Sequence, residues 1–466
     1  MQGAIAANRF GYGLRPQEQL PTEPQAWLLG QFDRYDPRPA PIAMHPRTEE
    51  VARMVADLSF PTPPDGISRG IEDRRARARE LNRNAERLYR DGVRARLDTA
   101  LQSETPFVER LVHFWANHFA VSGTRGRRGA LAATLEFDAV RPHVLGRFED
   151  LLFANIRHPA LLDYLDQTGS MGPNSPAAIR RNSYRRRMRQ PDEFGSNENF
   201  AREVLELHTV GVNGGYTQAD VIEFAYALSG WSISRFILRT HMEPAESGSF
   251  VFHSAWHEPG RRTVMGRTYG QPGEQKGVAI LKDLAGHPET ARHISWKLAR
   301  HFVADDPPEA LVTRMADRFL ATGGDLAAVY TVLVTAPDAW VQPYAKVRTP
   351  WDWTVASLRA LGVRSGEGME PDRLLSRLGQ AVWSPGSPAG YPDIAGAWAG
   401  SNLMLQRVRA SGQIASAAGG SANVSALAGR LFGEAISEAT RREIGRPDAS
   451  GDALALLFLS REFYRR

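Results

Sequence analysis

The chain has 466 residues, no cysteine and a formal net charge of +5, from 57 basic and 52 acidic side chains. Without a thiol, disulfides, iron–sulfur clusters, cysteine zinc sites and cysteine nucleophiles are excluded, so a protein-held metal would need His, Asp or Glu. Lysine occurs only four times, and none of the four stands in a P-loop sequence, which argues against nucleotide hydrolysis.

The start of the chain predicts no targeting segment. Residues 1–10 lack the basic region and apolar run of a secretory signal, and nowhere do about 18 consecutive apolar residues predict a membrane span. We therefore expect no membrane span. We expect a cytoplasmic location, or a periplasmic one if a partner protein exports the chain.

Helical periodicity dominates the sequence. It predicts helices over 68–101, 106–121, 127–141, 158–166, 197–210, 217–229, 273–285, 289–303, 307–321, 325–335, 350–361, 371–379, 402–410 and, in pieces, 425–458. The exception lies near 249–268, where short alternating runs flank Pro259-Gly260 and predict a β-hairpin. The predicted class is all-α, a multi-helix globular array with this small hairpin.

Two regions are expected along the chain. Residues 1–345 form the main helical domain, and residues 346–466 form a C-terminal helical part packed on it, either as a separate unit or as one continuous domain. Arginines between residues 180 and 189 are flanked by turn residues and predict a surface loop. Because this cluster has almost no interleaved aromatics, we expect no nucleic-acid partner.

The helix that begins at Thr105-Pro106 combines several polar groups. At 100° per residue, His118 and Trp115 fall on its apolar face, whereas His113 and Asn117 fall opposite. His118 is either a core histidine with satisfied hydrogen bonds or a ligand-binding group. We take His113, Trp115, Asn117 and His118 as candidate substrate-binding residues.

The densest polar segment is 197–210. Its spacing places Glu198, Arg202 and Glu206 in one stripe, with Glu203 beside it. This stripe is either an ion-pair ladder on a helix surface or a pair of carboxylates and an arginine facing a pocket, where one acid would have a raised pKa for acid–base chemistry. The candidate catalytic residues of this segment are Glu198, Arg202, Glu203 and Glu206.

A third cluster contains His253, His257 and Glu258. Pro259 and the spacing exclude the H-E-x-x-H zinc helix, but a loop could bring imidazole and carboxylate to a shared site. His257 is therefore a further catalytic candidate. A divalent metal held by His, Asp or Glu is compatible with these clusters, although no spacing identifies its ligands.

The sequence resembles a known family through runs distributed over nearly its whole length. These runs are Phe114–Phe119, Asn197–Glu203, Glu206–Gly211, Gly215–Gln218, Ser229–Trp231, His287-Pro288, Lys297, His301–Val303, Lys346–Pro350 and Gly379-Gln380. They are similar to the bacterial "domain of unknown function 1800" family. Asn197 and Trp231, within these runs, complete the candidate substrate-binding residues.

The resemblance implies a partner more than an activity. Members of this family are often encoded beside the "domain of unknown function 1501" family, which resembles alkaline phosphatases and sulfatases. It implies a phosphatase- or sulfatase-like partner protein. Where many relatives have His-Asp in the hairpin region, this chain has His257-Glu258.

Two functions follow as hypotheses. The first is an enzyme that uses carboxylate and histidine acid–base chemistry on a polar, anionic or glycan-like substrate. Metal-assisted hydrolysis is one form that this chemistry can take. The second is a non-catalytic helical scaffold that binds the phosphatase-like partner through the 68–101 helix or the 180–189 arginines.

Overall fold

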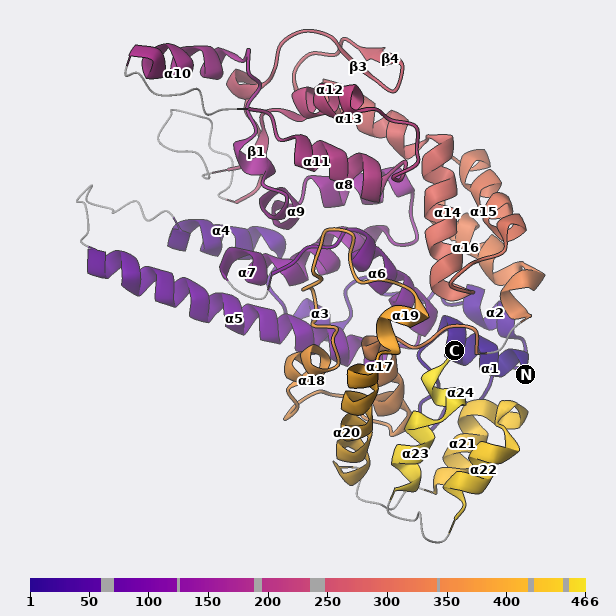
Figure 1. Cartoon of the computed structure of the whole chain (residues 1–466). Helices are drawn as coiled ribbons and strands as arrows, with labels where there is room; N and C mark the ends of the chain where they lie inside the picture. The colour runs from indigo at the N-terminus through magenta and orange to yellow at the C-terminus, as the bar shows by residue number, and fades with distance from the viewer. Residues whose placement is uncertain are drawn as a thin grey trace.

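The computed structural model describes residues 1–59, 71–123, 126–187, 195–234, 248–341, 344–417, 423–446 and 452–466. Helices form most of this described part, and the strands in it are short and paired in twos (Figure 1). The predicted all-α class is therefore confirmed. None of the helices in the described ranges is both long and apolar enough to cross a membrane.

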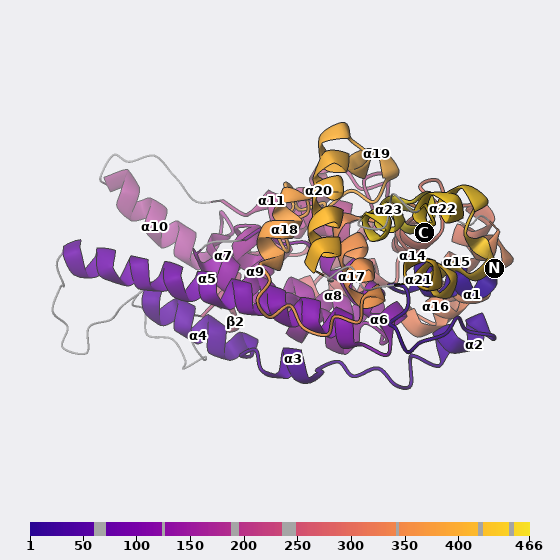
Figure 2. The same cartoon turned by 90° about the horizontal axis from the view of Figure 1, so that it is seen from below.

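The N-terminal quarter ends in a single long helix. Its elements are α1 (Gln2–Ile5), the π-helical turn η1 (Ala6–Phe10), α2 (Pro24–Leu29), α3 (Ala40–Ala43), α4 (Thr48–Ser59) and α5 (Ile71–Gln102). At about 1.5 Å per residue, the 32 residues of α5 span roughly 48 Å. Its N-terminal end extends away from the rest of the molecule on the same side as α10 (Figures 1 and 2).

The central elements surround the apolar core. They are α6 (Pro106–His118), α7 (Gly126–Thr134) with η2 (Leu135–Val140) and η3 (Arg141–His143), α8 (Phe148–Ile156), α9 (Pro159–Tyr164), η4 (Gln167–Gly169), α10 (Pro176–Arg187), α11 (Glu198–Glu203) with η5 (Val204–His208), and α12 (Gln218–Leu228). The prediction of a surface loop over 180–189 is wrong for residues 180–187, which belong to α10. Pro176 starts this helix, and good helix formers follow it. Residue 189 lies outside the described residues.

The strands differ in pairing from the predicted hairpin. β2 (Phe250–Phe252) pairs antiparallel with β1 (Trp231–Ile233), and β3 (Arg262–Val264) pairs with β4 (Arg267–Tyr269), with η6 (Ser254–Trp256) between the two pairs. The chain reverses at Met265-Gly266, where both φ angles are positive, 46° and 76°. Two successive positive φ angles suit a two-residue hairpin turn, whereas Pro259-Gly260 only connects the two pairs.

The second half consists almost entirely of helices. They are α13 (Glu274–Ala285), α14 (Pro288–Phe302), α15 (Glu309–Ala321), α16 (Leu326–Thr335), η7 (Pro337–Trp340), α17 (Pro350–Ala360), α18 (Pro371–Arg377), α19 (Ala395–Trp398), α20 (Ser401–Ala417), α21 (Val424–Phe432), η8 (Gly433–Ala435), α22 (Glu438–Ile444), α23 (Ala453–Leu459) and α24 (Arg461–Tyr464).

Buried apolar side chains form two clusters. The larger cluster extends from Ile5 to Trp383, and the smaller one joins the C-terminal helices to Ala7 and Leu14. α17 contributes to both, with Trp351 in the first and Trp353 in the second. α17 therefore links the two apolar clusters. The division of the chain into two regions near residue 345 stays a prediction.

Candidate functional site

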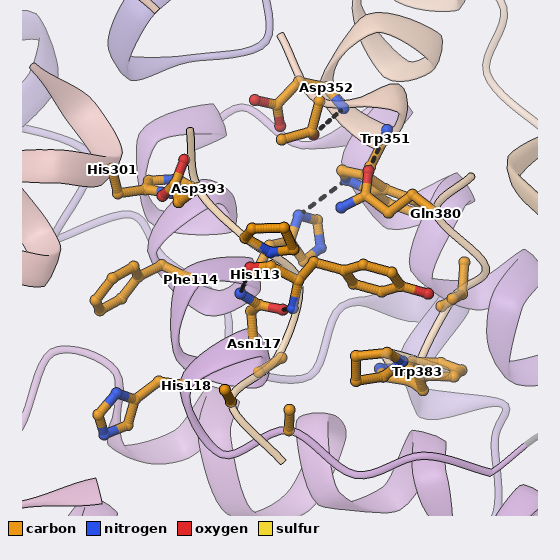
Figure 3. A pocket seen from close by; sticks show the side chains of 18 of the residues that line it. His113, Phe114, Asn117, His118, His301, Trp351, Asp352, Gln380, Trp383 and Asp393 are labelled. Carbon is orange, nitrogen blue, oxygen red and sulfur yellow. Dashed lines mark hydrogen bonds and ion pairs between the residues drawn. The ribbon is translucent and has the colours of Figure 1, made fainter. Parts of the chain in front are cut away.

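A cavity of about 260 Å³ lies between the C-terminal halves of α6 and α14, the start of α17 and the segment 380–394 (Figure 3). Its aromatic lining consists of Tyr12, Phe114, Trp296, Trp351, Trp383 and Tyr391. Its charged lining consists of Arg96, Lys297, Arg300, Asp352 and Asp393. The volume is close to the roughly 300 Å³ at which small-molecule sites begin, so the cavity suits a small ligand.

Three of the four α6 residues predicted to bind substrate line this cavity. They are His113, Asn117 and His118 (Figure 3). The cavity lies against the C-terminal end of α6. There, residues of the predicted apolar face and of the predicted polar face both line it. Trp115 does not line the cavity, because its ring is fully buried and its Nε1 donates to the Tyr330 hydroxyl at 2.6 Å.

His113 is held in one neutral form. Trp351 donates from Nε1 to His113 Nδ1 at 3.1 Å, and the Tyr12 hydroxyl contacts the same nitrogen. Because an indole N–H can only donate, Nδ1 is unprotonated and the proton is on Nε2, which lies 3.7 Å from Glu136 Oε1. Burial, followed by nearby arginines, lowers the pKa of His113 well below its ordinary value.

The carboxylate behind His113 belongs to a buried ion pair. Arg96 Nε lies 2.9 Å from Glu136, and Trp383 donates to the same carboxylate at 2.8 Å. The Arg96 guanidinium also lies over the rings of Trp351 and Trp383, with 4.3 and 5.5 Å to their centroids. Glu136 is 1% exposed, so this network fixes the floor of the cavity.

Lys297 and His118 form a hydrogen-bonded pair at the cavity. Lys297 Nζ donates to His118 Nδ1 at 2.9 Å, and His118 Nε2 lies 3.3 Å from the carbonyl oxygen of His208. An ammonium only donates, so His118 is a neutral imidazole with its proton on Nε2. Burial, then the charge of Lys297, lowers the pKa of His118 well below its ordinary value. Burial also lowers the pKa of Lys297 to about 8.

Arg300 adds a second cation beside Lys297. Its guanidinium lies 4.6 Å from the Trp296 ring centroid, and its buried Nε has no hydrogen-bond partner. Within the described part of the chain, neither Arg300 nor Lys297 forms an ion pair with a carboxylate. The opposite charge of Asp393 acts on Lys297, without an ion pair between them. Two cations at one cavity, neither of them in an ion pair among the described residues, favour the binding of an anion.

His301 is positioned between an arginine and an aspartate. Arg110 donates to His301 Nε2 at 3.1 Å, so the proton of His301 is on Nδ1, from which it donates to Asp393 at 2.5 Å. Burial lowers the pKa of His301. Burial acts to raise the pKa of Asp393, but His301 and Lys346, 3.4 Å away, hold it far below its ordinary value.

Asp352, the other acid of the cavity, is also paired. Arg110 lies 3.3 Å and Arg466 3.2 Å from its Oδ2. Burial acts to raise the pKa of Asp352, but these two arginines outweigh it and lower the pKa. Both acids of the cavity are therefore in ion pairs with basic side chains, whereas no ion pair within the described ranges includes Lys297 or Arg300.

The wall opposite α6 is held by one asparagine. Asn117 donates to the Tyr391 carbonyl at 2.9 Å and accepts from the Tyr391 N–H at 2.8 Å. The neighbouring Gly390 has a φ of 80° and packs against the Asn117 backbone, which leaves no room for a Cβ. Trp383, on the same wall, has a φ of 47°, a strained value for a bulky residue that the surrounding contacts must maintain.

The predicted carboxylate stripe lies away from this cavity. Gln218 donates to Glu198 at 2.8 Å, Arg202 donates to Gln218 at 2.6 Å, and Arg202 lies 3.8 Å from Glu206. None of these side chains lines the cavity. Arg202 and Glu206 form one ion pair of the predicted ladder, whereas Gln218 stands between Arg202 and Glu198. The catalytic role of these residues stays a prediction.

The remaining candidates of this segment have other contacts. Burial, then the charge of Glu206, raises the pKa of half-buried Glu203, which lies beside the predicted stripe. Asn197 caps α11 by accepting from Phe200 N–H at 3.2 Å. η5, which follows α11, contacts the cavity residue His118 through the carbonyl of His208.

His257 forms a second lysine–histidine pair, away from the cavity lining. Its Nδ1 donates to the Ser229 carbonyl at 3.0 Å, and its Nε2 accepts from buried Lys276 at 3.2 Å. The Glu258 carboxylate accepts from Asn174 at 2.7 Å, and its charge acts to raise the pKa of His257 and Lys276 against the larger effect of burial.

Two further expectations concern ligands. Trp231 is fully buried in β1 under Arg157, whose guanidinium lies 5.3 Å from its ring, so it does not reach the cavity. Across the described ranges, no three side chains among His, Asp and Glu are grouped so that they could hold a metal ion. The described ranges therefore contain no set of His, Asp and Glu ligands for the divalent metal that the sequence allowed.

Sequence spacing does not identify Lys297, His301 or Asp393 as groups of the cavity. Lys297 and His301 are four residues apart on α14, so a helical projection places them on one face. Both also stand in the family-like runs. Asp393 had no comparable signal, because it lies in an irregular segment rich in Pro and Gly.

The described structure is a mostly helical protein with a cavity lined by aromatic, basic and acidic side chains. The chain belongs to the family described as "Protein of unknown function (DUF1800)", whose sequence model matches residues 5–465. The predicted family is thus confirmed over essentially the whole chain. Comparisons with curated proteins and with solved structures give no match.

Proposed function

We propose that the protein is an enzyme that binds a small anionic substrate in the cavity and transfers protons through Lys297 and His118. One observation supports this most directly: an ammonium with a lowered pKa donates to a neutral, buried imidazole at the cavity surface. Lowered lysine pKa values near neutrality are typical of groups that donate or accept protons in reactions.

The preference for an anion follows from the ion pairs of the lining. Asp352 and Asp393 are in ion pairs, while Lys297 and Arg300 are in none among the described residues. A carboxylate, sulfate or phosphate would accept hydrogen bonds from Arg300 in a planar, bidentate geometry. The aromatic walls would contact the apolar part of the same ligand.

His301 and Asp393 supply a second group for proton transfer. An aspartate that accepts from His301 Nδ1 stabilises the imidazolium that forms if the ring takes a proton. Arg110 occupies Nε2, so a substrate must displace this contact before His301 reacts. We therefore assign the first proton transfer to Lys297 and His118, and a supporting role to His301.

Ligand-induced stabilisation tests this proposal. Thermal unfolding is measured with acetate, oxalate, phosphate and sulfate for the wild type, Arg300→Gln and Lys297→Met. A bound anion at 100 times its Kd stabilises by about 2.7 kcal/mol. Loss of a charged hydrogen bond costs about 1.5–3 kcal/mol, so we expect affinity to fall by roughly tenfold or more in both variants.

Arg373→Gln serves as the control, since this arginine is exposed and pairs only with exposed Glu370 in the described structure. It should bind anions as the wild type does. Absence of stabilisation by every anion, or equal binding by wild type and Arg300→Gln, would contradict an anion site in the cavity.

A second candidate is the non-catalytic scaffold for a phosphatase- or sulfatase-like partner. It is favoured by α5, whose N-terminal end extends beyond the body of the molecule (Figure 2). Arg83 and Arg87 on this helix are exposed. Charge reversal of both arginines to Glu should abolish co-purification with such a partner. An unchanged complex would exclude this part of α5 as the contact.

A further inference from the structure

We propose that Lys297 forms an imine with the carbonyl carbon of a small 2-oxo acid, whose carboxylate is bound by Arg300. This inference rests on the proposed function and adds to it a covalent step and a substrate class. It follows from the placement of the four lysines, the partner of Lys297 and the second cation beside it.

Only one of the four lysines of the chain is placed for such a step. Lys346 is 1% exposed and donates to Asp305 at 2.5 Å, so its amine is engaged in an ion pair. Lys276 is 3% exposed and does not line the cavity. Lys282 is exposed and lies 3.5 Å from Glu149. Lys297 alone lines the cavity, without a carboxylate partner in the described structure.

His118 is oriented to accept the proton that an attacking amine must lose. Its unprotonated Nδ1 lies 2.9 Å from Lys297 Nζ, and its other nitrogen donates to the backbone carbonyl of His208. That carbonyl fixes the tautomer, so the lone pair of Nδ1 points at the ammonium. Transfer of one proton gives a neutral amine and an imidazolium.

The step balances without a further reagent. The amine nitrogen bonds to the carbonyl carbon while the C=O π electrons move to oxygen, and a proton passes from nitrogen to that oxygen. The imidazolium of His118 then returns its proton to the hydroxyl, which leaves as water as the nitrogen lone pair forms the C=N bond. An ammonium and a carbonyl compound thus become a protonated imine and water, with one positive charge on each side.

Arg300 explains why the carbonyl compound should be an anion. It is three residues after Lys297 on α14, so the two side chains are neighbours on one helix face, and both line the cavity. A carboxylate on Arg300 would therefore place an adjacent carbonyl group toward Lys297. Burial and a nearby cation are also the conditions under which lysines act as nucleophiles. The lowered pKa of Lys297 agrees with this chemistry.

Borohydride trapping tests the imine. The full-length protein is incubated with pyruvate, reduced with sodium borohydride, digested and mapped by mass spectrometry. We expect a reduced pyruvate adduct on Lys297 and none on Lys276, which serves as an internal control. The adduct should be absent in Lys297→Arg and at least tenfold weaker in Arg300→Gln.

Oxalate distinguishes the imine from the anion site of the proposed function, because it binds as an anion but forms no imine with Lys297. Lys297→Arg keeps the positive charge and should still be stabilised by oxalate, which also shows that the variant is folded. Stabilisation of the wild type by pyruvate and oxalate through Arg300, with no adduct on Lys297, would overturn the imine and leave the anion site intact. Failure of pyruvate and oxalate to bind would overturn the imine, and failure of acetate, phosphate and sulfate as well would overturn the anion site.

Discussion

Replacing Lys297 by Met should change how stability depends on pH. Burial lowers the pKa of Lys297 from 10.5 to about 8, so between these values the unfolded chain binds a proton that the folded chain has lost. The free energy of unfolding therefore rises with pH across this window. At about 1.36 kcal/mol per pKa unit, a difference of about 2.5 corresponds to roughly 3 kcal/mol.

This magnitude is an upper bound, because the Lys297 side chain is only partly enclosed and solvent screens its charge. Methionine cannot titrate, so Lys297→Met lacks the increase. The stability of the variant relative to wild type should be greatest below pH 8 and should fall by up to about 3 kcal/mol toward pH 10.5. Loss of the hydrogen bond to His118 shifts the whole difference but not its dependence on pH.

Urea unfolding at intervals from pH 7 to pH 10.5 measures this difference, and other titrating groups cancel between the two proteins. Lys282→Met is the matched control, because this lysine is exposed on α13. Its curve should run parallel to that of the wild type. If the Lys297→Met curve also runs parallel, within about 0.5 kcal/mol over the window, Lys297 does not have a lowered pKa and the reasoning fails.

Three structural predictions concern the floor and wall of the cavity. Glu136→Gln should lower the free energy of unfolding in urea by about 3 kcal/mol, because it leaves Arg96 buried without its counter-ion. Adding Arg96→Met should lower it little further, and simple additivity of the two substitutions would contradict the pairing. Asn117→Ala should speed hydrogen exchange of the Tyr391 amide by roughly tenfold, since that amide loses its acceptor; unchanged exchange would refute the clamp. Gly390→Ala should lower the midpoint of urea unfolding and weaken anion binding, because a Cβ meets the Asn117 backbone. A stabilised variant would show that the positive φ of Gly390 is not required.

Much of the fold could be predicted from local signals. The Thr105-Pro106 start and the apolar spacing after it predicted α6, and helical periodicity predicted α14 and α17. The hairpin pairing could not be predicted, because Met265-Gly266 is an inconspicuous turn beside the stronger Pro259-Gly260 signal. The helical form of 176–187 was missed because turn residues on either side outweighed its helix propensity.

The site was predictable only in part. His113, Asn117 and His118 were identified because they are polar groups on one helix, yet their partners come from distant segments. No spacing rule links His118 to Lys297, 179 residues later. The acids chosen from the sequence were close together in the chain, whereas the cavity obtains its acids from α17 and an irregular segment. Tertiary packing, not helical period, selects these groups.

The hydrogen bonds around the cavity have a consequence for folding. His113 contacts Tyr12 across 101 residues and Trp351 across 238, and Asn117 holds Tyr391 across 274. Contacts of such sequence separation require closure of large loops, which slows their formation relative to local helices. The cavity should therefore be among the last parts of the molecule to assemble, and the ability to bind a ligand would report that the early and late segments of the chain have docked.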